Sequence, residues 1–163
     1  SDAIAIGAIK YTILRSSIGS DIIFDSAASI SFEGDSGPYL QYSAVRAQSV
    51  LEKAEKEGIK AATITGHTGQ KSAVHIPAKV GELERLLTRF SDIVSRARDN
   101  RAPQAVANYL ITLAAAFNSF YATSTIADAS EPLAPYRVAL TKAFVSTMTK
   151  GLWVLGISVP KKM

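Results

Sequence analysis

Residues 80–97 carry the clearest hydrophobic pattern in the chain. Apolar side chains recur there every three or four positions, and charged residues such as Glu84 and Arg96 fall between them. The apolar positions are Val80, Leu83, Leu86, Leu87, Phe90, Ile93, Val94 and Ala97. Because 3.6 residues make one turn of an α-helix, this spacing places all of them on one face. The segment is predicted to form one amphipathic helix.

The same helical period, or a run of almost purely apolar residues, appears in other parts of the chain. Further helices are predicted at 4–14, 36–58, 103–121 and 140–155. The first has hardly any polar face, which favours a buried helix. Ser36 offers a cap and Pro38 a preset φ for a first turn, while Gly58 and Gly156 are typical helix ends. The tail after Gly156 is apolar enough to dock on the other helices.

Two segments lack a helical pattern. Residues 21–25 are short and apolar between turn-forming residues, so a brief extended piece is predicted there. Residues 57–78 are rich in Thr, Gly, Ser and Lys without a sustained period, and they are predicted to form a long surface loop. With so little strand, the predicted fold class is all-α, a helical bundle.

Composition narrows the class of protein. The 163 residues are 47% hydrophobic and 20% charged, which is enough apolar material for one folded core. Cysteine is absent, so disulfides, thiol nucleophiles and thiolate zinc sites are excluded, and a reducing cytoplasmic location is expected. No uninterrupted apolar stretch matches a membrane span, and no signal peptide is seen at the start. Because Ser1 falls inside a helical pattern, we expect a further segment to precede it.

Positive charge is concentrated toward the carboxyl end. Residues 1–94 carry a net charge of −1, whereas residues 95–163 carry +5. Such an imbalance favours a partner that bears phosphates, since neutralising phosphates releases condensed counterions. A helical surface on which cations happen to cluster is the simpler alternative.

No constellation of side chains predicts catalysis within the chain. Residues 66–72 superficially resemble a phosphate-binding loop, but Gln70 stands where that motif requires glycine. His67 and His75 lack carboxylates at ligand spacing, so no metal site is predicted. The glutamates lie among lysines and arginines at helical spacing, as in ordinary exposed ion pairs. Catalytic residues are expected to be absent.

Three stretches, read in order, resemble the end of class I arginyl-tRNA synthetases. The first is 32–42, Phe-Glu-Gly-Asp-Ser-Gly-Pro-Tyr-Leu-Gln-Tyr, followed by Arg46; the family has threonine where Ser36 stands. The second runs from Pro103 to Tyr121. The third begins at Arg137 and closes with Pro-Lys-Lys-Met at 160–163. The likeness covers nearly the whole chain, with 57–78 as the divergent part.

The resemblance implies a helical bundle of the DALR anticodon-binding type, the tRNA-binding part of a class I aminoacyl-tRNA synthetase. Residues 1–35 would be a linker helix and loop leading from a catalytic domain, and 36–163 the bundle. The implied partners are tRNA for arginine and that catalytic domain, with no membrane and a monomeric state. ATP and magnesium would bind the catalytic domain, because its His-x-Gly-His and Lys-Met-Ser-Lys signatures are absent from this chain.

The resemblance also implies roles for individual residues. Contacts to the anticodon would come from Tyr42, Arg46, Asn118, Tyr121 and Met163, with Tyr121 stacking on a splayed base. A loop that rearranges when tRNA docks would comprise Ser31, Phe32, Glu33, Gly34, Asp35 and Ser36. Where some relatives have another aromatic residue, this chain has Thr125.

Structural alternatives exist for several of these residues. By periodicity alone Tyr121 fits a core position, and Tyr39 is interpreted as packing. Arg46 could pair with a surface carboxylate such as Glu33, and Met163 could be only a docked chain end. At the level of the whole chain, the alternatives are a helical protein-interaction module with a basic face and an anticodon-binding domain of another synthetase, such as the glycine enzyme's beta subunit.

Overall fold

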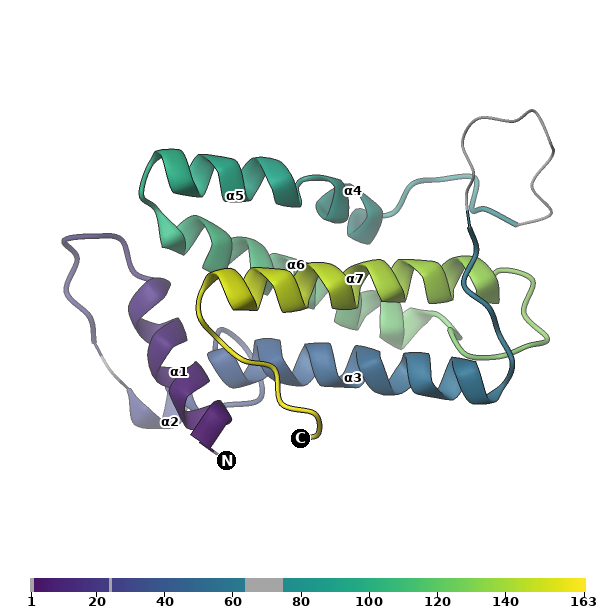
Figure 1. The fold of residues 1–163 in the computed structure, drawn as a ribbon, viewed down its shortest axis with the longest axis horizontal. Helices are drawn as coiled ribbons and strands as arrows, with labels where there is room; N and C mark the ends of the chain where they lie inside the picture. The colour runs from purple at the N-terminus through teal and green to yellow at the C-terminus, as the bar shows by residue number, and fades with distance from the viewer. Residues whose placement is uncertain (1, 24, 64–74) are drawn as a thin grey trace.

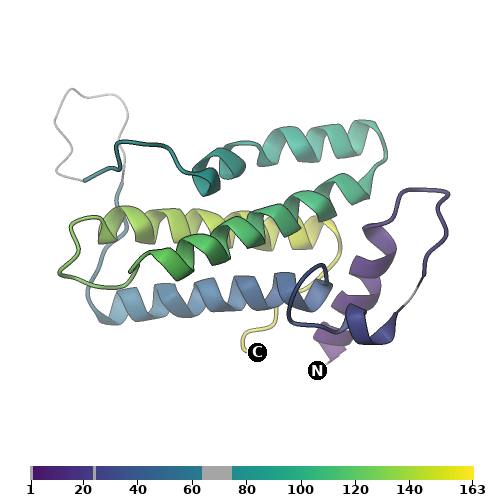
Figure 2. The same ribbon diagram turned by 180° about the vertical axis from the view of Figure 1, so that it is seen from behind.

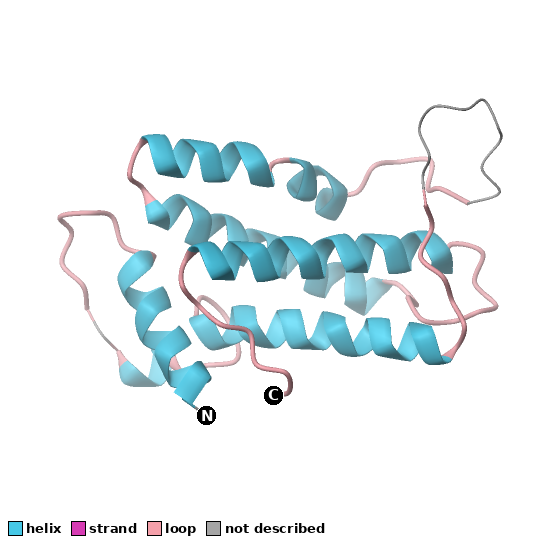
Figure 3. Cartoon of the chain, in the orientation of Figure 1, coloured by secondary structure: helices cyan, strands magenta, loops and turns pink. Residues whose placement is uncertain are grey.

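Seven α-helices form the secondary structure of residues 2–23, 25–63 and 75–163, the part of the chain that the computed structural model describes (Figure 3). They are α1 (Asp2–Leu14), α2 (Ser26–Ser29), α3 (Gly37–Lys56), α4 (Glu82–Thr88), α5 (Phe90–Asp99), α6 (Pro103–Thr123) and α7 (Ala134–Val154). No strand occurs within these residues. The all-α class predicted from the sequence is confirmed.

The three long helices α3, α6 and α7 lie side by side and form the body of the bundle (Figures 1 and 2). Helices α4 and α5 cover α6 on one side, and α1 lies across the amino-terminal end of α3. The core consists mainly of fully buried apolar side chains from α6 and α7, including Leu110, Leu113, Phe117, Phe144 and Met148. This packing determines which side chains of α3 lie beside those of α6.

Helix α3 begins and ends where local signals predict. The Ser36 hydroxyl accepts a hydrogen bond from the Tyr39 amide at 3.1 Å, and Pro38 stands in the first turn. At the other end Gly58 adopts φ +70°, a left-handed conformation that glycine reaches without steric cost. The predicted helix at 36–58 is confirmed, as are the helices after Pro103 and before Gly156.

The single helix predicted at 80–97 is wrong, because the structure breaks it into α4 and α5 at Arg89. The Thr88 hydroxyl donates to the Arg85 carbonyl at 2.9 Å, the acceptor that the Arg89 amide would use in an unbroken helix. The Arg89 amide bonds instead to Leu86, three residues back, at 3.0 Å. The apolar stripe continues across the break, so periodicity did not reveal it.

The prediction for α1 needs correction in its burial. The segment is helical, but only one side packs on the bundle, through Gly7, Ala8 and Tyr11. Ile6, Ile9 and Ile13 are each about half exposed, at 50, 48 and 49%. The mostly apolar sequence therefore reflects one face that packs on α3 and a second apolar face that stays about half exposed.

No strand forms in the described part of residues 21–25, although the backbone of Asp25 is extended. Asp25 instead caps the short helix α2, and its carboxylate accepts hydrogen bonds from the amides of Ala27 and Ala28. This helix was not predicted, since a run of four small residues has no hydrophobic period.

Close contact between α1 and α3 depends on two glycines. A Cβ on Gly37 would lie 2.4 Å from the Gly7 carbonyl oxygen, so the backbones meet where neither residue has a side chain. Beside them the buried Gln41 side chain donates to the carbonyls of Ala3 (3.0 Å) and Ser158 (2.7 Å). Gln41 thus joins α1, α3 and the carboxyl-terminal tail, and the predicted docking of that tail is confirmed.

Residues 57–63 and 75–78 have no helix beyond the end of α3, in agreement with the predicted loop. The Ala62 amide donates to the Pro135 carbonyl at 2.8 Å, which holds the start of this connection against α7. The phosphate-loop-like residues 66–72 and His67 lie outside the described residues.

Helix α6 is apolar and long enough to meet the length and composition test for a membrane span. Central helices of folded cores meet the same test. Leu110, Leu113 and Phe117 of α6 are fully buried between neighbouring helices, which accounts for its apolar composition.

Candidate nucleic-acid interface

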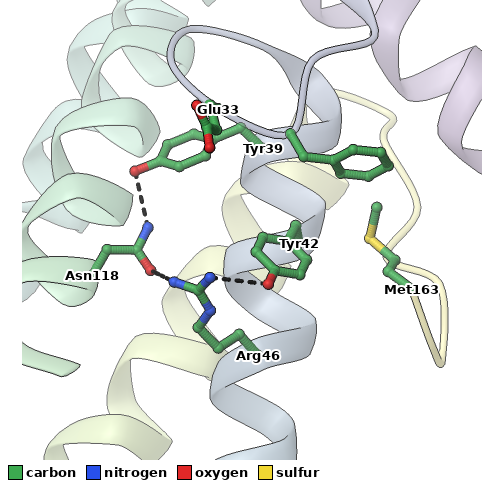
Figure 4. Close-up of a pocket in the computed structure, with 7 residues that line it drawn as sticks. Glu33, Tyr39, Tyr42, Arg46, Asn118 and Met163 are labelled. Carbon is green, nitrogen blue, oxygen red and sulfur yellow. Dashed lines mark hydrogen bonds between the residues drawn. The ribbon is translucent and has the colours of Figure 1, made fainter. Parts of the chain in front are cut away.

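A pocket of about 630 Å³ opens between α3, α6, the loop before α3 and the end of the chain (Figure 4). It is lined by Phe32, Glu33, Tyr39, Tyr42, Arg46, Asn118 and Met163. Four of the predicted anticodon-contacting residues, and two of the predicted loop residues, are thus brought together from four separate segments. Tyr121, the fifth, lies beside the pocket and contacts Arg46.

Helix α3 supplies the polar wall of the pocket because Tyr39, Tyr42 and Arg46 are spaced three and four residues apart. This spacing places the three side chains on one face of the helix. Helix α6 supplies Asn118 and Tyr121, which are also one turn apart. The packing of α3 against α6 brings the two faces together.

Arg46 lies at the centre of the arrangement. Its Nη1 donates to Asn118 Oδ1 at 2.8 Å and its Nη2 donates to the Tyr42 hydroxyl at 3.0 Å (Figure 4). The guanidinium carbon lies 4.5 Å from the centroid of the Tyr42 ring and 5.5 Å from that of Tyr121. Both distances fall within the range of cation–π attraction. Among the described residues Arg46 has no carboxylate partner, so the alternative pairing with Glu33 does not occur.

Asn118 is the hydrogen-bonding centre between the helices. Its Nδ2 donates to the Tyr39 hydroxyl at 2.9 Å and to Ser43 Oγ at 3.1 Å, while its oxygen accepts from Arg46. The buried Ser43 hydroxyl in turn donates to the Tyr39 carbonyl at 2.9 Å. The side chain of Asn118 is therefore held in one orientation.

Tyr121 is not a core residue, since 43% of it is exposed. Its ring lies 6.4 Å from that of Phe117 at an interplanar angle of 26°, and Phe117 stacks on Phe144 at 4.0 Å. At the opposite end of the site Phe32 meets the Tyr42 ring edge-to-face at 6.1 Å. A row of planar groups therefore runs from the surface at Phe32 through Arg46 to the core.

The loop at 31–36 is divided between the pocket and α1. Phe32 and Glu33 line the pocket, whereas Asp35 faces α1. Asp35 accepts a hydrogen bond from the buried Tyr11 hydroxyl and forms an ion pair with Arg15 at 2.8 Å. Burial, and then this hydrogen bond, raise the pKa of Tyr11 well above its ordinary value. The hydroxyl of Ser36 closes the loop by donating to the carbonyl of Ser31.

Met163 reaches the rim of the pocket with 39% of its surface exposed. The tail that carries it is anchored upstream by buried Ile157. The chain end thus borders the same pocket as Arg46 (Figure 4).

Tyr39 and Ser43 are parts of this site that the sequence interpretation missed. Tyr39 was assigned to packing, yet its hydroxyl lines the pocket and is bonded to Asn118. The usable signal was spacing, since Tyr39, Ser43 and Arg46 follow one another at intervals of four and three on the face that already contained Tyr42.

The site offers a cation, several aromatic faces and hydroxyl donors, which together suit an unpaired nucleotide. Within the described residues no group of three His, Asp or Glu side chains is placed to hold a metal ion. No described nucleophile is paired with a general base in the pocket. These groups can support the binding of such a nucleotide.

The DALR anticodon binding domain family matches residues 40–163. The chain belongs to this family. The DALR assignment fits the geometry, since the matched residues include Tyr42, Arg46, Asn118, Tyr121 and Met163.

Relatives of this DALR domain are arginine–tRNA ligases. The Pyrococcus furiosus enzyme is 36% identical over 166 residues, a match that covers 98% of this chain and 25% of the relative. The Streptococcus pneumoniae enzyme is 35% identical over 161 residues, with coverages of 99% and 27%. The chain therefore spans about a quarter of the length of the curated relatives it matches.

Solved structures show the same fold. Thermus thermophilus arginyl-tRNA synthetase superposes with a TM-score of 0.78 at 31% identity, over 99% of this chain and 27% of that one. The Plasmodium falciparum enzyme gives a TM-score of 0.79 at 22% identity, with the same coverages. At that identity the second likeness concerns the fold alone.

Proposed function

We propose that this chain binds the anticodon loop of tRNA for arginine, as the tRNA-binding part of an arginine–tRNA ligase. One observation carries the proposal: the Arg46 guanidinium lies between the rings of Tyr42 and Tyr121 at the edge of an open pocket. Such a combination of planar and cationic groups complements a base that has left its stack. The arginine specificity rests on the relatives, which are arginine–tRNA ligases.

In this proposal an unpaired base stacks on the exposed part of Tyr121, and the pocket receives the base edge. The remaining N–H groups of Arg46 and the chain end at Met163 border the space where that edge would lie. The loop at 31–36 adjusts when RNA enters, because Phe32 and Glu33 contact the pocket while Asp35 holds the loop to α1 through polar contacts.

The exposed face of α1 is proposed to contact the remainder of the synthetase. Ile6, Ile9 and Ile13 follow helical spacing and form an apolar stripe on the side away from α3. An apolar stripe of this kind is typical of a surface that another domain covers. The catalytic domain, which would bind ATP and magnesium and perform the arginylation, is the proposed occupant. The complete enzyme is proposed to act as a monomer in the cytoplasm.

Binding to tRNAs that differ only in the middle anticodon base tests the proposal. The chain is expected to prefer the tRNA for arginine, and its affinity should fall linearly with the logarithm of salt concentration, since phosphate contacts release counterions. Equal affinity for every tRNA would defeat the proposal. Failure of excess tRNA to displace a bound acidic protein would favour a protein-interaction module instead.

A further inference from the structure

The orientation of the Asn118 amide follows from the chemistry of Arg46. A guanidinium has hydrogen-bond donors and no acceptor, so the Asn118 atom that faces Arg46 Nη1 at 2.8 Å must be the oxygen. The NH₂ group then faces Tyr39 and Ser43, at 2.9 and 3.1 Å. Both protons of this amide are engaged inside the protein, which leaves Asn118 no donor for a ligand.

The orientation of the Asn118 amide also sets the role of the Tyr39 hydroxyl. Since the Asn118 amide donates to it, the Tyr39 oxygen acts as an acceptor and its own proton remains to be donated. Within the described residues, the Tyr39 hydroxyl donates no hydrogen bond of its own. The ring is only partly buried and lines the pocket, so the proton has open space to point into.

Ser43 cannot take over this role. Its hydroxyl proton is donated to the Tyr39 carbonyl at 2.9 Å, and the side chain is fully buried. The oxygen of Ser43 serves as the second acceptor for the Asn118 amide. Two hydroxyls can therefore offer a donor to the pocket. One belongs to Tyr39, and the other to Tyr42, whose oxygen accepts from Arg46.

We propose that Tyr39 donates a hydrogen bond from its hydroxyl to an acceptor atom on the bound nucleotide, and that Asn118 is a positioning residue that orients Tyr39 and Arg46 without touching RNA itself. The inference rests on the proposed function and deepens it. It reverses the expectation from the sequence, in which Asn118 contacts the anticodon and Tyr39 only packs. The ligand atom is an acceptor such as a base carbonyl oxygen, an unprotonated ring nitrogen or a phosphate oxygen, because a hydroxyl proton requires an acceptor.

A double-mutant cycle with Tyr39→Phe and Asn118→Asp tests the assignment. Tyr39→Phe removes the donor alone, so the affinity of the chain for the tRNA for arginine should fall about tenfold, the usual effect of one hydrogen bond. Asn118→Asp keeps the contact to Arg46 but presents an oxygen to Tyr39, whose proton then turns inward. This variant should also bind weakly, and the added charge should weaken it further.

The two substitutions should not be additive. In Asn118→Asp the Tyr39 proton already points away from the pocket, so adding Tyr39→Phe removes no further hydrogen bond to RNA. The double variant should therefore bind as Asn118→Asp does. The comparison cancels any repulsion between the new carboxylate and RNA, since that repulsion is present in both proteins. Tyr136→Phe is the matched control, because it removes a hydroxyl that donates to Glu84 at 2.7 Å away from the pocket. Its tRNA affinity should be unchanged.

Wild-type affinity for tRNA in Tyr39→Phe, or fully additive losses in the double variant, would overturn this inference while leaving the proposed function intact. Absence of tRNA binding by the wild-type chain would defeat the proposed function and the inference together. The thermal midpoint of Tyr39→Phe should stay close to that of wild type, because Ser43 still accepts from Asn118 in that variant. If Tyr39→Phe unfolds, Asn118→Asp alone decides: tRNA affinity equal to wild type would contradict the assignment.

Discussion

At the residue scale, Arg46 sets the character of the site because it can donate hydrogen bonds and cannot accept them. Lysine in its place would keep the charge but lose the planar group that lies over Tyr42 and reaches Asn118 at the same time. The half-buried setting also strengthens the attraction between the cation and the rings. The proposed recognition surface is therefore largely formed before any ligand arrives.

Tyr121→Ala should weaken tRNA binding without unfolding the chain. The ring is 43% exposed, so its loss removes a stacking surface and little core. Removing one stacked base contact costs about 1 to 3 kcal/mol. Filter binding and thermal melting of the variant would check both parts.

Phe117→Ala is the matched contrast for Tyr121→Ala. Phe117 is fully buried and stacks on Phe144, so its loss should destabilise the fold by about 3 to 5 kcal/mol. Equal destabilisation by both substitutions would show that Tyr121 belongs to the core after all.

Tyr109 should make stability depend on pH in the alkaline range. Burial raises the pKa of its hydroxyl from 10.0 to about 12, and the hydroxyl donates to the Leu86 carbonyl at 3.0 Å. The proton is held more tightly in the folded state than in the unfolded state. The protonated hydroxyl therefore contributes to the free energy of unfolding below pH 10.0, and this contribution is lost as pH rises toward 12. Tyr109→Phe should therefore show a shallower fall of the thermal midpoint across that range. An identical pH profile in the two proteins would contradict this reasoning.

At the element scale, the ends of the long helices were predictable because they depend on local chemistry. Ser36 with Pro38, Gly58 and Pro103 mark boundaries that the structure reproduces. The break at Arg89 was not predictable, since it depends on which donor reaches the Arg85 carbonyl while the apolar period stays intact.

Burial of α1 was mispredicted for a related reason. An apolar sequence indicates that a helix face packs against something. It does not indicate whether the packing partner lies in the same part of the chain. Tyr11 packs into the bundle, whereas Ile6, Ile9 and Ile13 remain about half exposed.

The candidate site shows the same limit. Tyr42, Arg46 and Tyr121 could be proposed from the family resemblance, and the spacing along α3 supported two of them. The bond between Tyr39 and Asn118 joins residues 79 positions apart, so it requires the packing of α3 on α6 to be known. The hydrophobic period of the sequence does not indicate which residues far apart in the chain become hydrogen-bond partners.

Gly37→Ala should destabilise the junction of α1 and α3. The new Cβ would meet the Gly7 carbonyl oxygen at 2.4 Å, and backbone atoms must shift to relieve the clash. Overpacking of this kind costs about 1 to 3 kcal/mol. Urea unfolding would measure the loss, with Gln48→Ala on the exposed side of α3 as the control. A Gly37→Ala variant as stable as wild type would mean that the helices can separate freely.

At the scale of the whole molecule, the site and the apolar face of α1 are joined through the loop at 31–36. Phe32 contacts Tyr42 at one end of this loop, and at the other end Asp35 contacts Tyr11 of α1 and Arg15, which follows α1 directly. Movement of the loop on RNA binding would therefore change its contacts with α1. In the proposed synthetase that helix borders the catalytic domain.

Replacing Ile6, Ile9 and Ile13 together by glutamine should remove an apolar surface without unfolding this chain. Glutamine forms helices well, and each isoleucine is already about half exposed. We expect the wild-type chain to bind an apolar fluorescent dye such as anilinonaphthalene sulfonate and the variant to bind much less, at similar thermal midpoints. Equal dye binding would place the exposed apolar surface elsewhere.

The most direct test of the central claim is an NMR titration of the chain, with its tyrosine rings isotopically labelled, by the anticodon stem–loop of tRNA for arginine. The ring signals of Tyr42 and Tyr121 should shift strongly as a base stacks beside Arg46. Tyr109 and Tyr136 lie outside the pocket lining and should change little. Binding that shifts the latter pair and leaves Tyr42 and Tyr121 unmoved would contradict the account, since RNA would then occupy another face.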